Sequence, residues 1–245
     1  MTGVPGVRLA MWSGPRNIST ALMRSWENRP DTRVVDEPLY AYYLDRTGLN
    51  HPARDEVIAA GEPDWTRVVA ELTAPVHGVY YQKHMTHHLI AQLPRDWIGG
   101  LTNVLLIRDP AEVVASYVRS RSDVVAEDIG LVQQAELYDQ LRAEVGTAPP
   151  VIDAADFLRA PEAYLRWLCD FVDVEFTPAM LSWPAGTRDS DGVWAPYWYS
   201  AVLASTGFEP YRPRTAELRG DAREAAERSR AHYERLHAER VRLTQ

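Results

Sequence analysis

The sequence predicts a single-domain α/β fold in three layers, with a central parallel sheet between two layers of helices. Three observations lead to this fold class. Short apolar runs alternate with longer helical patterns, as in parallel strands joined by helical crossovers. The first apolar run ends in a Gly-Pro turn that opens a helix, as phosphate-binding loops do. The 245 residues, 46% of them hydrophobic, suffice for one large domain or two small ones, and no repeat or low-complexity linker divides them. We therefore expect one domain over residues 1–245.

The N-terminal part alternates strand, helix and strand. The run GVRLAMW at residues 6–12 predicts a buried strand. Residues 19–28 predict a helix, because their apolar side chains recur at helical spacing. These side chains are Leu22, Met23 and Trp26. The run TRVVDEP at residues 32–38 predicts a second strand, which Pro38 ends.

The pattern is weaker in residues 39–75. Within this segment, residues 55–60 and 65–72 look helical, with proline-containing breaks between them. The run VHGVYYQ at residues 76–82 then predicts a third strand, followed by a short helix that reaches Leu93.

The middle of the chain has the clearest strand. The run TNVLLIR at residues 102–108 is that strand, and residues 111–121 predict the helix that follows it. Pro110 stands at the start of this helix, where its missing N–H costs nothing. Residues 127–145 predict an amphipathic helix that Gly146 ends.

The C-terminal part begins with a fifth strand within residues 149–157 and a helix over residues 161–172. Residues 182–213 are rich in loops and aromatic side chains. Residues 215–242 predict a charged terminal helix, which occupies the C-terminal segment 215–245. In a parallel sheet of this kind, ligands bind at the carboxyl ends of the strands. Polar residues that follow the predicted strands are therefore the candidates for a functional site.

Composition excludes several classes of function. The net charge of −8 argues against a nucleic-acid partner, because nucleic-acid binding depends on a broad basic face. The single cysteine, Cys169, cannot form an internal disulfide, which fits a reducing compartment. We find no signal peptide and no apolar run long enough to span a membrane. We therefore expect a cytoplasmic protein with neither a membrane nor a nucleic-acid partner.

The first candidate constellation is the stretch MWSGPRNISTALMRSW at residues 11–26. A loop between a strand and a helix N-terminus offers backbone N–H groups and the positive end of the helix dipole to an anion. Arg16 adds a positive charge, and Ser19 and Thr20 add hydroxyl donors. The nucleotide motif G-x-x-x-x-G-K-[ST] is incomplete, because Ser19 and Thr20 occupy its glycine and lysine positions. The alternative is a capped surface helix after an ordinary turn.

The second constellation is LIRDPAEVVASY. Arg108 ends the clearest strand, and Ser116 lies eight residues later, in the second turn of the next helix. An arginine and a hydroxyl so placed can converge on one phosphate group, which a guanidinium binds in a bidentate manner. The alternative is a surface ion pair between Arg108 and Asp109, a weak interaction.

The third constellation combines DEPLY with YQKHM. Glu37 and His84 both follow predicted strands, so we expect both at the same rim, and either could act as a general base. Lys83, next to His84, is the single lysine among 26 lysines and arginines. His87 and His88 could suggest a metal, but the chain has no cysteine pair or paired His-carboxylate motif to complete a site. We therefore expect no metal.

With these residues in view, the chain resembles the PAPS-dependent sulfotransferases, where PAPS is 3′-phosphoadenosine-5′-phosphosulfate. The first loop of that family reads roughly P-[KR]-S-G-[ST]-T, and PRNIST at residues 15–20 is similar to it. The matching residues are Pro15, Arg16, Ser19 and Thr20, whereas Asn17 and Ile18 differ. The resemblance implies that this P-loop-like segment binds the 5′-phosphosulfate through Arg16, Asn17, Ile18, Ser19 and Thr20.

The resemblance extends over about residues 7–200. The second family motif, R-[ND]-P with a serine eight residues after the arginine, matches Arg108, Asp109, Pro110 and Ser116. It implies that Arg108 and Ser116 bind the 3′-phosphate. The stretch TRDSDGVWAPYW resembles a degenerate form of the later basic loop of the family. It implies that Arg188, with Gly192 and Trp194, lies near the 3′-phosphate or the adenine.

The resemblance also implies an activity, namely sulfuryl transfer from PAPS to a hydroxyl, with an amine as the second choice of acceptor and PAP as the product. No metal is implied, because Arg16, backbone N–H groups and the helix dipole can stabilise the charge on the leaving phosphate. Two branches of the family supply the base differently. His84 beside Lys83 is similar to the histidine of K-T-H in the cytosolic branch, and Glu37 to the glutamate of carbohydrate-acting branches. We favour Glu37 slightly, in which case Lys83 could bind a bridging or sulfonate oxygen.

Two other functions compete with this interpretation. One is a small-molecule kinase that uses ATP on the same P-loop fold, and the other is a nucleotide-binding protein without catalysis. The acceptor is expected to be a small molecule that the sequence does not name, and residues 39–75 are expected to cover its site as an insertion. The aromatic stretch VWAPYWYS at residues 193–200 could line an acceptor pocket or form a homodimer surface, but we expect its rings to pack in the core.

Overall fold

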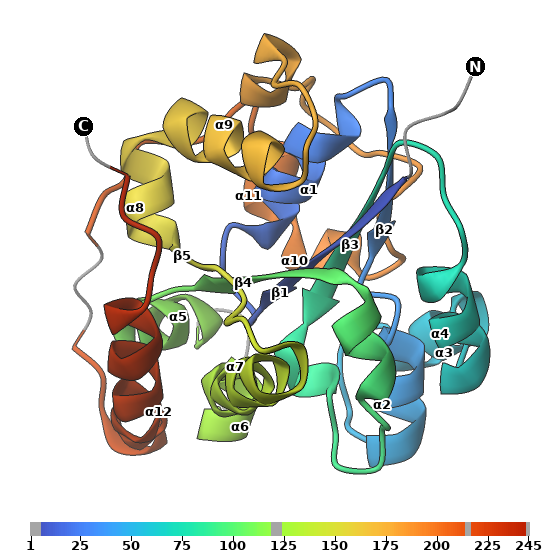
Figure 1. Ribbon diagram of the computed structural model, residues 1–245. Helices are drawn as coiled ribbons and strands as arrows, with labels where there is room; N and C mark the ends of the chain where they lie inside the picture. Colours follow the sequence, from blue (N-terminus) through green and yellow to red (C-terminus); the bar gives the residue numbers. More distant parts are fainter. Residues whose placement is uncertain (1–5, 119–123, 214–216, 244–245) are drawn as a thin grey trace.

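The fold is built on one sheet of five parallel strands (Figure 1). The structure is a computed structural model, and it describes residues 6–118, 124–213 and 217–243. The strand order is β2-β3-β1-β4-β5. The strands are β1 (Val7–Ser13), β2 (Thr32–Asp36), β3 (Val79–Met85), β4 (Thr102–Ile107) and β5 (Val151–Asp153). This confirms the predicted parallel sheet.

Helices cover both faces of the sheet, which makes the three layers (Figure 1). Alternate side chains of β1 enter two separate cores, as the period of a strand requires. Leu9 and Met11 pack with α1 (Ser19–Glu27), α8 (Ala154–Arg159) and α9 (Pro161–Phe171). Ala10 and Trp12 enter the second core, on the opposite face. Helices of that core are α4 (Trp65–Thr73), α5 (Pro110–Tyr117), α7 (Leu131–Val145) and α12 (Gly220–Ala238).

Most predicted elements are present, with shifted ends. The third strand runs over β3, residues 79–85, so it starts and ends three residues later than the predicted 76–82. The helix predicted over 127–145 is two helices, α6 (Ala126–Ile129) and α7, because Gly130 between them takes the left-handed φ of 76°. Residues 119–121 of the helix predicted over 111–121, and residues 215–216 of the terminal helix, lie outside the described residues.

The segment 39–75 is more helical than its sequence predicts. It contains α2 (Tyr40–Thr47), which the sequence pattern did not predict, and then α3 (Arg54–Ala60) and α4. Three short 3-10 helices are η1 (Thr86–His88), η2 (Asp96–Gly100) and η3 (Pro178–Leu181). The aromatic stretch folds as α10 (Ala195–Trp198) and α11 (Ser200–Leu203). No helix among the described residues is both long and apolar enough to cross a membrane.

The topology places a ligand site at the carboxyl end of β1. From this central strand the chain moves to one side for β2 and β3, and then to the other side for β4 and β5. A sheet that changes direction in this way opens a crevice at the carboxyl ends of the strands on either side of the switch. The loop after β1 therefore lies between the residues that follow β3 and those that follow β4.

Candidate active site

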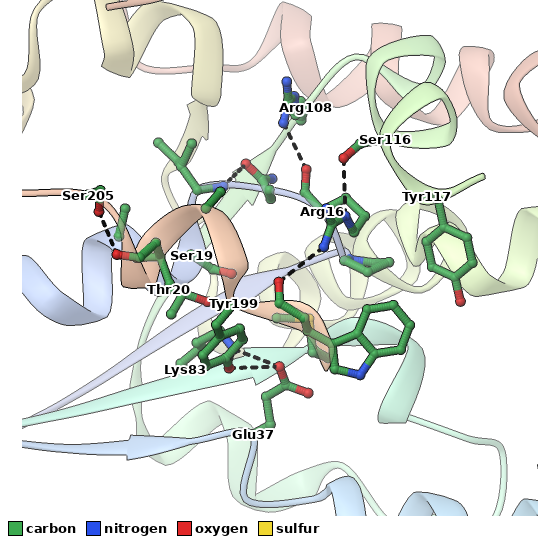
Figure 2. Close-up of a pocket in the computed structure, with 18 of the residues that line it drawn as sticks. Arg16, Ser19, Thr20, Glu37, Lys83, Arg108, Ser116, Tyr117, Tyr199 and Ser205 are labelled. Carbon is green, nitrogen blue, oxygen red and sulfur yellow. Dashed lines mark hydrogen bonds and ion pairs between the residues drawn. The ribbon is translucent and has the colours of Figure 1, made fainter. Parts of the chain in front are cut away.

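A cavity of about 290 Å³ lies at this switch point (Figure 2). Its wall includes the whole loop from Pro15 to Ala21, together with Glu37 and Lys83 on one side and Arg108 and Ser116 on the other. The topology therefore brings residues of all three constellations singled out in the sequence into one space, although His84 is not among them.

The loop after β1 is shaped to receive an anion. Arg16 adopts the left-handed φ of 55°, which is uncommon for a residue with a side chain and often marks a functional site. Helix α1 begins with no side-chain cap and no acidic residue in its first turn, so its positive end faces the cavity without competition. Asn17 caps the loop instead, because its Oδ1 accepts from Ile18 N at 2.8 Å and its Nδ2 donates to the Leu106 carbonyl at 3.1 Å.

Arg108 and Ser116, from the second constellation, form hydrogen bonds with Arg16 of the first. The Nη1 of Arg108 donates to the carbonyl of Arg16 at 2.8 Å, and the Nε of Arg16 donates to the Oγ of Ser116 at 3.1 Å (Figure 2). The guanidinium of Arg16 also donates to the Trp198 carbonyl at 3.2 Å. Arg108 is paired with Glu112 at 2.9 Å, rather than with Asp109. Asp109 instead caps α5 and pairs with Arg230 at 2.7 Å.

The opposite wall holds a carboxylate with an unusual backbone. Glu37 has a φ of 43°, and its side chain is 11% exposed. Its Oε1 accepts from Lys83 Nζ at 2.6 Å, and its Oε2 lies 3.9 Å from His88 Nε2. Lys83 also donates to Asp36 Oδ1 and to the Tyr199 hydroxyl, each at 2.7 Å. A strained backbone at a cavity wall is typical of a functional residue.

Burial and neighbouring charges together set the pKa values of Glu37 and Lys83. Burial raises the pKa of Glu37 above its ordinary value, against the opposing attraction of Lys83. Burial alone would lower the pKa of Lys83, but the charges of Asp36 and Glu37 outweigh it and raise that pKa. The wall opposite Arg16 thus presents a carboxylate with increased proton affinity next to a firmly charged ammonium.

His84 lies away from this cavity. Its ring is 1% exposed and stacks on Trp12 with the ring centroids 4.0 Å apart, and its Nε2 lies 3.2 Å from Gln82 Oε1. Burial lowers the pKa of His84 to about 3. The expectation that His84 shares the rim with Glu37 is therefore not met. Because β3 continues to Met85, consecutive side chains of Lys83 and His84 point to opposite faces of the sheet.

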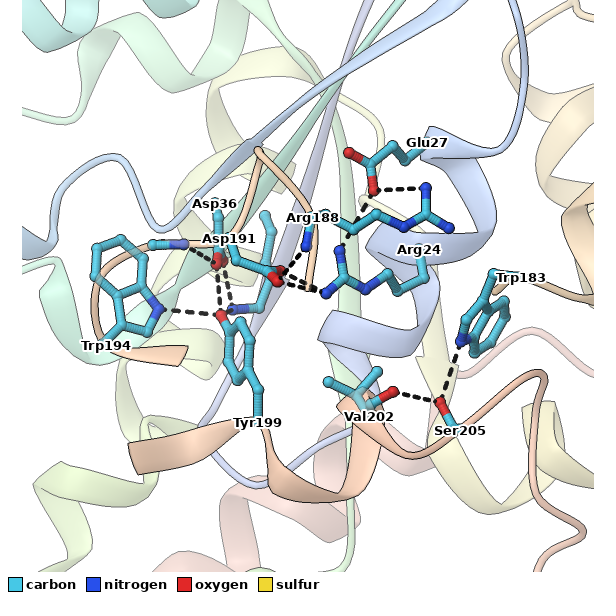
Figure 3. Close-up of polar contacts among 12 residues, drawn as sticks. Arg24, Glu27, Asp36, Trp183, Arg188, Asp191, Trp194, Tyr199, Val202 and Ser205 are labelled. Atoms are coloured by element: carbon cyan, nitrogen blue, oxygen red, sulfur yellow. Dashed lines mark hydrogen bonds and ion pairs between the residues drawn. The ribbon is translucent and has the colours of Figure 1, made fainter. Parts of the chain in front are cut away.

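Arg188 also lies away from the cavity, contrary to the expected place near a 3′-phosphate. Its Nη1 is 3.5 Å from Glu27 Oε2, at the C-terminal end of α1, whereas the cavity is at the N-terminal end (Figure 3). At 1.5 Å per residue, these two ends of the helix are roughly 12 Å apart. The loop that carries Arg188 is held at this end of α1 by Asp191, which pairs with the buried Arg24 at 2.6 Å.

The fold brings to Glu37 several residues that the sequence did not predict at this site. Asp36 and Tyr199 complete the contacts of Lys83, and Trp194 donates to the Tyr199 hydroxyl at 3.1 Å (Figure 3). Tyr40 lines the cavity beside Glu37. Asp36 had a signal, because it is an acidic residue at a predicted strand end. Tyr199 belongs to the aromatic stretch 193–200, but no local pattern indicated its contact with Glu37, which is 162 residues away in sequence.

Within the described residues, one group of side chains has the spacing of a metal site, and it lies outside this cavity. It consists of Asp153, Asp156 and His237. Both carboxylate oxygens of Asp156 already accept from arginines, Arg159 at 2.8 Å and Arg240 at 2.7 Å. Asp153 is likewise used, since it caps α8 and accepts from Tyr233. This group is therefore a set of ion pairs and caps rather than a free ligand set.

Comparison with known proteins gives three findings. A family model described as "Sulfotransferase domain" matches residues 7–235. Branched-chain-amino-acid aminotransferase-like proteins 1 and 2 of Arabidopsis thaliana are 40% and 38% identical over 211 and 199 residues, which is 84% and 80% of this chain. The matched parts are 38% and 35% of those proteins, so the chain spans little more than a third of the curated relatives it matches.

The third finding concerns the fold. The structure is similar to the sulfotransferase domain of the olefin synthase of Synechococcus PCC 7002, with a TM-score of 0.56 and 17% identity over 93% of this chain and 95% of that one. It is also similar to a sulfotransferase from Alicyclobacillus acidocaldarius, with a TM-score of 0.52 and 13% identity over 95% and 96% of the two chains. At these identities the likeness concerns the α/β fold.

Proposed function

The chain belongs to the sulfotransferase domain family, and from this premise we propose that it transfers a sulfuryl group from PAPS to a hydroxyl of a small molecule. Arg16, the first turn of α1 and the loop residues Asn17 to Thr20 hold the 5′-phosphosulfate in this proposal. Arg108 and Ser116 bind the 3′-phosphate, and Glu37 is the general base. An amine is the second choice of acceptor.

One observation carries the proposal. A single cavity joins an anion-binding loop on one wall to a carboxylate with raised pKa on the other. Group transfer from an anionic donor needs both features in one space, since the charge of the leaving group and the proton of the acceptor must be handled together.

The proposed reaction uses these two walls at once. The acceptor oxygen attacks sulfur and forms a new S–O bond, while the bond from sulfur to the bridging phosphate oxygen breaks. PAP leaves with that oxygen and its electron pair, and the acceptor proton passes to the carboxylate of Glu37. Arg16, the backbone N–H groups of the loop and the dipole of α1 stabilise the charge that develops on the leaving phosphate.

The contacts of Lys83 favour a role other than binding a bridging or sulfonate oxygen. An ammonium group has three N–H donors, and all three are used within the protein, toward Asp36, Glu37 and Tyr199. We therefore propose that Lys83 holds the base rather than a sulfonate oxygen. Arg16 is then the cation that faces the sulfuryl group.

The name of the plant relatives raises amino-group transfer as another function. Transamination uses pyridoxal phosphate joined to a lysine amine, so that amine must be able to lose its proton. Lys83 is the single lysine of the chain, and the carboxylates of Asp36 and Glu37 overcome the effect of burial and hold it charged. We do not propose transamination for this chain, which spans 38% of the length of the first relative.

The acceptor side of the cavity includes residues from the segment 39–75. Tyr40 of α2 and His51 line the cavity near Glu37, together with His87 and Trp198. Burial lowers the pKa of His87 to about 3, so this wall offers a neutral imidazole and aromatic surface next to the carboxylate. We propose that it binds a small acceptor without an anionic group, because Glu37 and the donor would both repel one.

The proposal is tested by nucleotide binding and by transfer of radioactive sulfate. PAP at 100 times its dissociation constant should stabilise the chain by about 2.7 kcal/mol, which raises the melting temperature by about 5–10 °C for a chain of this size. Incubation with ³⁵S-labelled PAPS and a panel of small alcohols and phenols should then give labelled product. A thermal shift with ATP and Mg²⁺ but none with PAP would favour the kinase alternative. PAP binding without transfer to any acceptor would favour the non-catalytic one.

A further inference from the structure

Asp36, which precedes the proposed base, is buried beside it and shares its lysine. The side chain of Asp36 is 2% exposed, and its Oδ1 accepts from Lys83 Nζ at 2.7 Å. Its Oδ2 accepts from the Tyr199 hydroxyl at 2.6 Å (Figure 3). Glu37 accepts from the same ammonium at 2.6 Å. Two carboxylates therefore compete for one cation inside the protein.

The second carboxylate changes the effect of Lys83 on the proton affinity of Glu37. A buried lysine paired only with Glu37 would strongly favour the ionised carboxylate, and a carboxylate so stabilised is a poor proton acceptor. Because Asp36 binds the same ammonium, its negative charge opposes the effect of Lys83 at Glu37. Burial is the largest influence on the pKa of Glu37, and it favours the neutral, protonated form.

We propose that Asp36 is a positioning residue of the active site. Its negative charge balances the positive charge of Lys83, so that Glu37 keeps the proton affinity that a general base requires. The proposal rests on the proposed function for the role of Glu37 as base. It assigns Asp36 no contact with substrate, because its contacts are with Lys83, Tyr199 and the backbone N–H of Gly192.

The same geometry keeps the site intact after proton transfer. When Glu37 takes a proton, its attraction to Lys83 is lost. Lys83 nevertheless keeps Asp36 and Tyr199 as partners at 2.7 Å each, so no unpaired ammonium is left buried. An unpaired buried charge is strongly unfavourable, and Asp36 removes that cost from the reaction.

Other charged and titratable groups also surround Glu37. They come from every element that packs against it: Tyr40 of α2, Lys83 of β3, His88 of η1 and Tyr199 after α10, with Arg16 and His87 on the cavity wall. Burial lowers the pKa of His88 well below its ordinary value, and burial raises that of Tyr199 well above it. Both are therefore neutral at neutral pH, which leaves Asp36 as the carboxylate that balances Lys83.

The test is a direct titration of Glu37 in the whole chain. Protein labelled with ¹³C in the glutamate carboxyl groups is titrated by NMR, and the Glu37 signal is assigned by its loss in Glu37→Gln. Asp36→Asn should lower the pKa of Glu37 by about 1–2 units, since Lys83 then acts on Glu37 alone. The matched control is Asp55→Asn, which removes a carboxylate whose side chain is 89% exposed. An unchanged Glu37 pKa in Asp36→Asn would overturn the proposal.

A second variant decides the question even if Asp36→Asn does not fold. Asp36→Asn combined with Lys83→Met removes both opposite charges. If they cancel at Glu37, its pKa should stay within about half a unit of the wild type. A rise of more than about one unit would mean that Lys83 dominates and that Asp36 has no such role.

Activity then separates this inference from the proposed function. In the acid range, the decrease of kcat/KM should move to lower pH in Asp36→Asn by the same amount as the Glu37 titration. A Glu37 titration that moves while the pH profile of transfer stays in place would mean that Glu37 is not the base. That outcome overturns the role of Asp36 in catalysis, whereas a chain without any sulfuryl transfer overturns the proposed function itself.

Discussion

At the scale of single residues, the two expected bases differ in one property, the face of the sheet that each occupies. Glu37 follows β2 and turns into the cavity through its left-handed backbone, with Lys83 at 2.6 Å. His84 lies within β3 and packs against Trp12 in the core. Both residues were candidates because a carboxylate and an imidazole can each accept a proton. Of the two, Glu37 lines the cavity and His84 does not.

Substitution of the two residues should separate them in activity as well. Glu37→Gln should lower kcat by about 10² to 10⁴ while the affinity for PAP stays near the wild-type value, since a general base contributes to the rate by that range. His84→Asn should keep its turnover and lose stability instead, because a buried stacked ring is removed. Both variants are assayed on one acceptor, with PAP binding measured in parallel. A His84→Asn protein that folds and has lost its turnover would contradict this assignment.

Arg108 is a second residue of the cavity wall whose proposed role can be tested. Arg108→Ala should weaken PAP binding by about 10- to 150-fold, the loss expected for one charge-assisted hydrogen bond. It should weaken adenosine 5′-phosphosulfate, which has no 3′-phosphate, by a smaller factor. That smaller loss is still expected, because Arg108 also holds the carbonyl of Arg16 at 2.8 Å. Calorimetric titration with both nucleotides measures the difference, and equal losses would mean that Arg108 supports the loop alone.

At the scale of elements, the loop from β1 to α1 depends on close backbone packing. A Cβ atom on Gly14 would lie 2.1 Å from the carbonyl oxygen of Ile129, at the end of α6. Gly130, which follows, has a left-handed φ of 76°, and a Cβ there would meet the hydroxyl of Thr86 at 2.5 Å. The loop between β1 and α1 is thus held by a turn more than a hundred residues later in the chain.

Gly14→Ala should therefore lower the stability of the folded chain and also distort the loop between β1 and α1. Insertion of a methyl group into a filled site costs about 1–3 kcal/mol, which corresponds to a decrease of several degrees in melting temperature for a chain of this size. PAP affinity should fall with it. Gly100→Ala is the matched control, since nothing lies within 4 Å of a Cβ at that position. A Gly14→Ala protein with wild-type stability and PAP affinity would contradict the packing argument.

At the scale of the whole molecule, the fold holds three histidines in neutral form: His84 in β3, and His87 and His88 in the 3-10 helix η1 that follows it. Burial lowers the pKa of His84 and of His87 to about 3, and lowers that of His88 well below its ordinary value. The unfolded chain binds protons at these residues near pH 6.5, whereas the folded chain does not. The stability that they contribute is therefore present above about pH 6.5 and is lost as the pH falls toward 3.

Acid should accordingly destabilise the chain before most carboxylates titrate. Each histidine costs about 1.4 kcal/mol per pH unit once the pH is well below 6.5, and the raised pKa of Glu37 acts in the opposite direction. Urea unfolding should thus show a stability that decreases between pH 6.5 and 5, with a slope to which each buried histidine contributes. His84→Gln should reduce this slope by about 1.4 kcal/mol per unit, and the exposed His77→Gln should leave it unchanged. Equal slopes in the two variants would contradict the neutral burial of His84.

The sequence by itself determined the strand-helix alternation, and it singled out the loop at residues 14–20 and the pair of Arg108 and Ser116, which the fold brings to one cavity. Local patterns suffice there, because apolar periodicity and turn residues act between near neighbours in the chain. The tertiary structure alone decided which face of the sheet His84 occupies. Because β3 ends three residues later than predicted, His84 lies within the strand and not in the loop after it. The tertiary structure also decided that Arg188 pairs with Glu27 and that Tyr199 joins Asp36, Glu37 and Lys83. Such contacts join residues far apart in the chain, and their energy depends on burial and charge that no local pattern records.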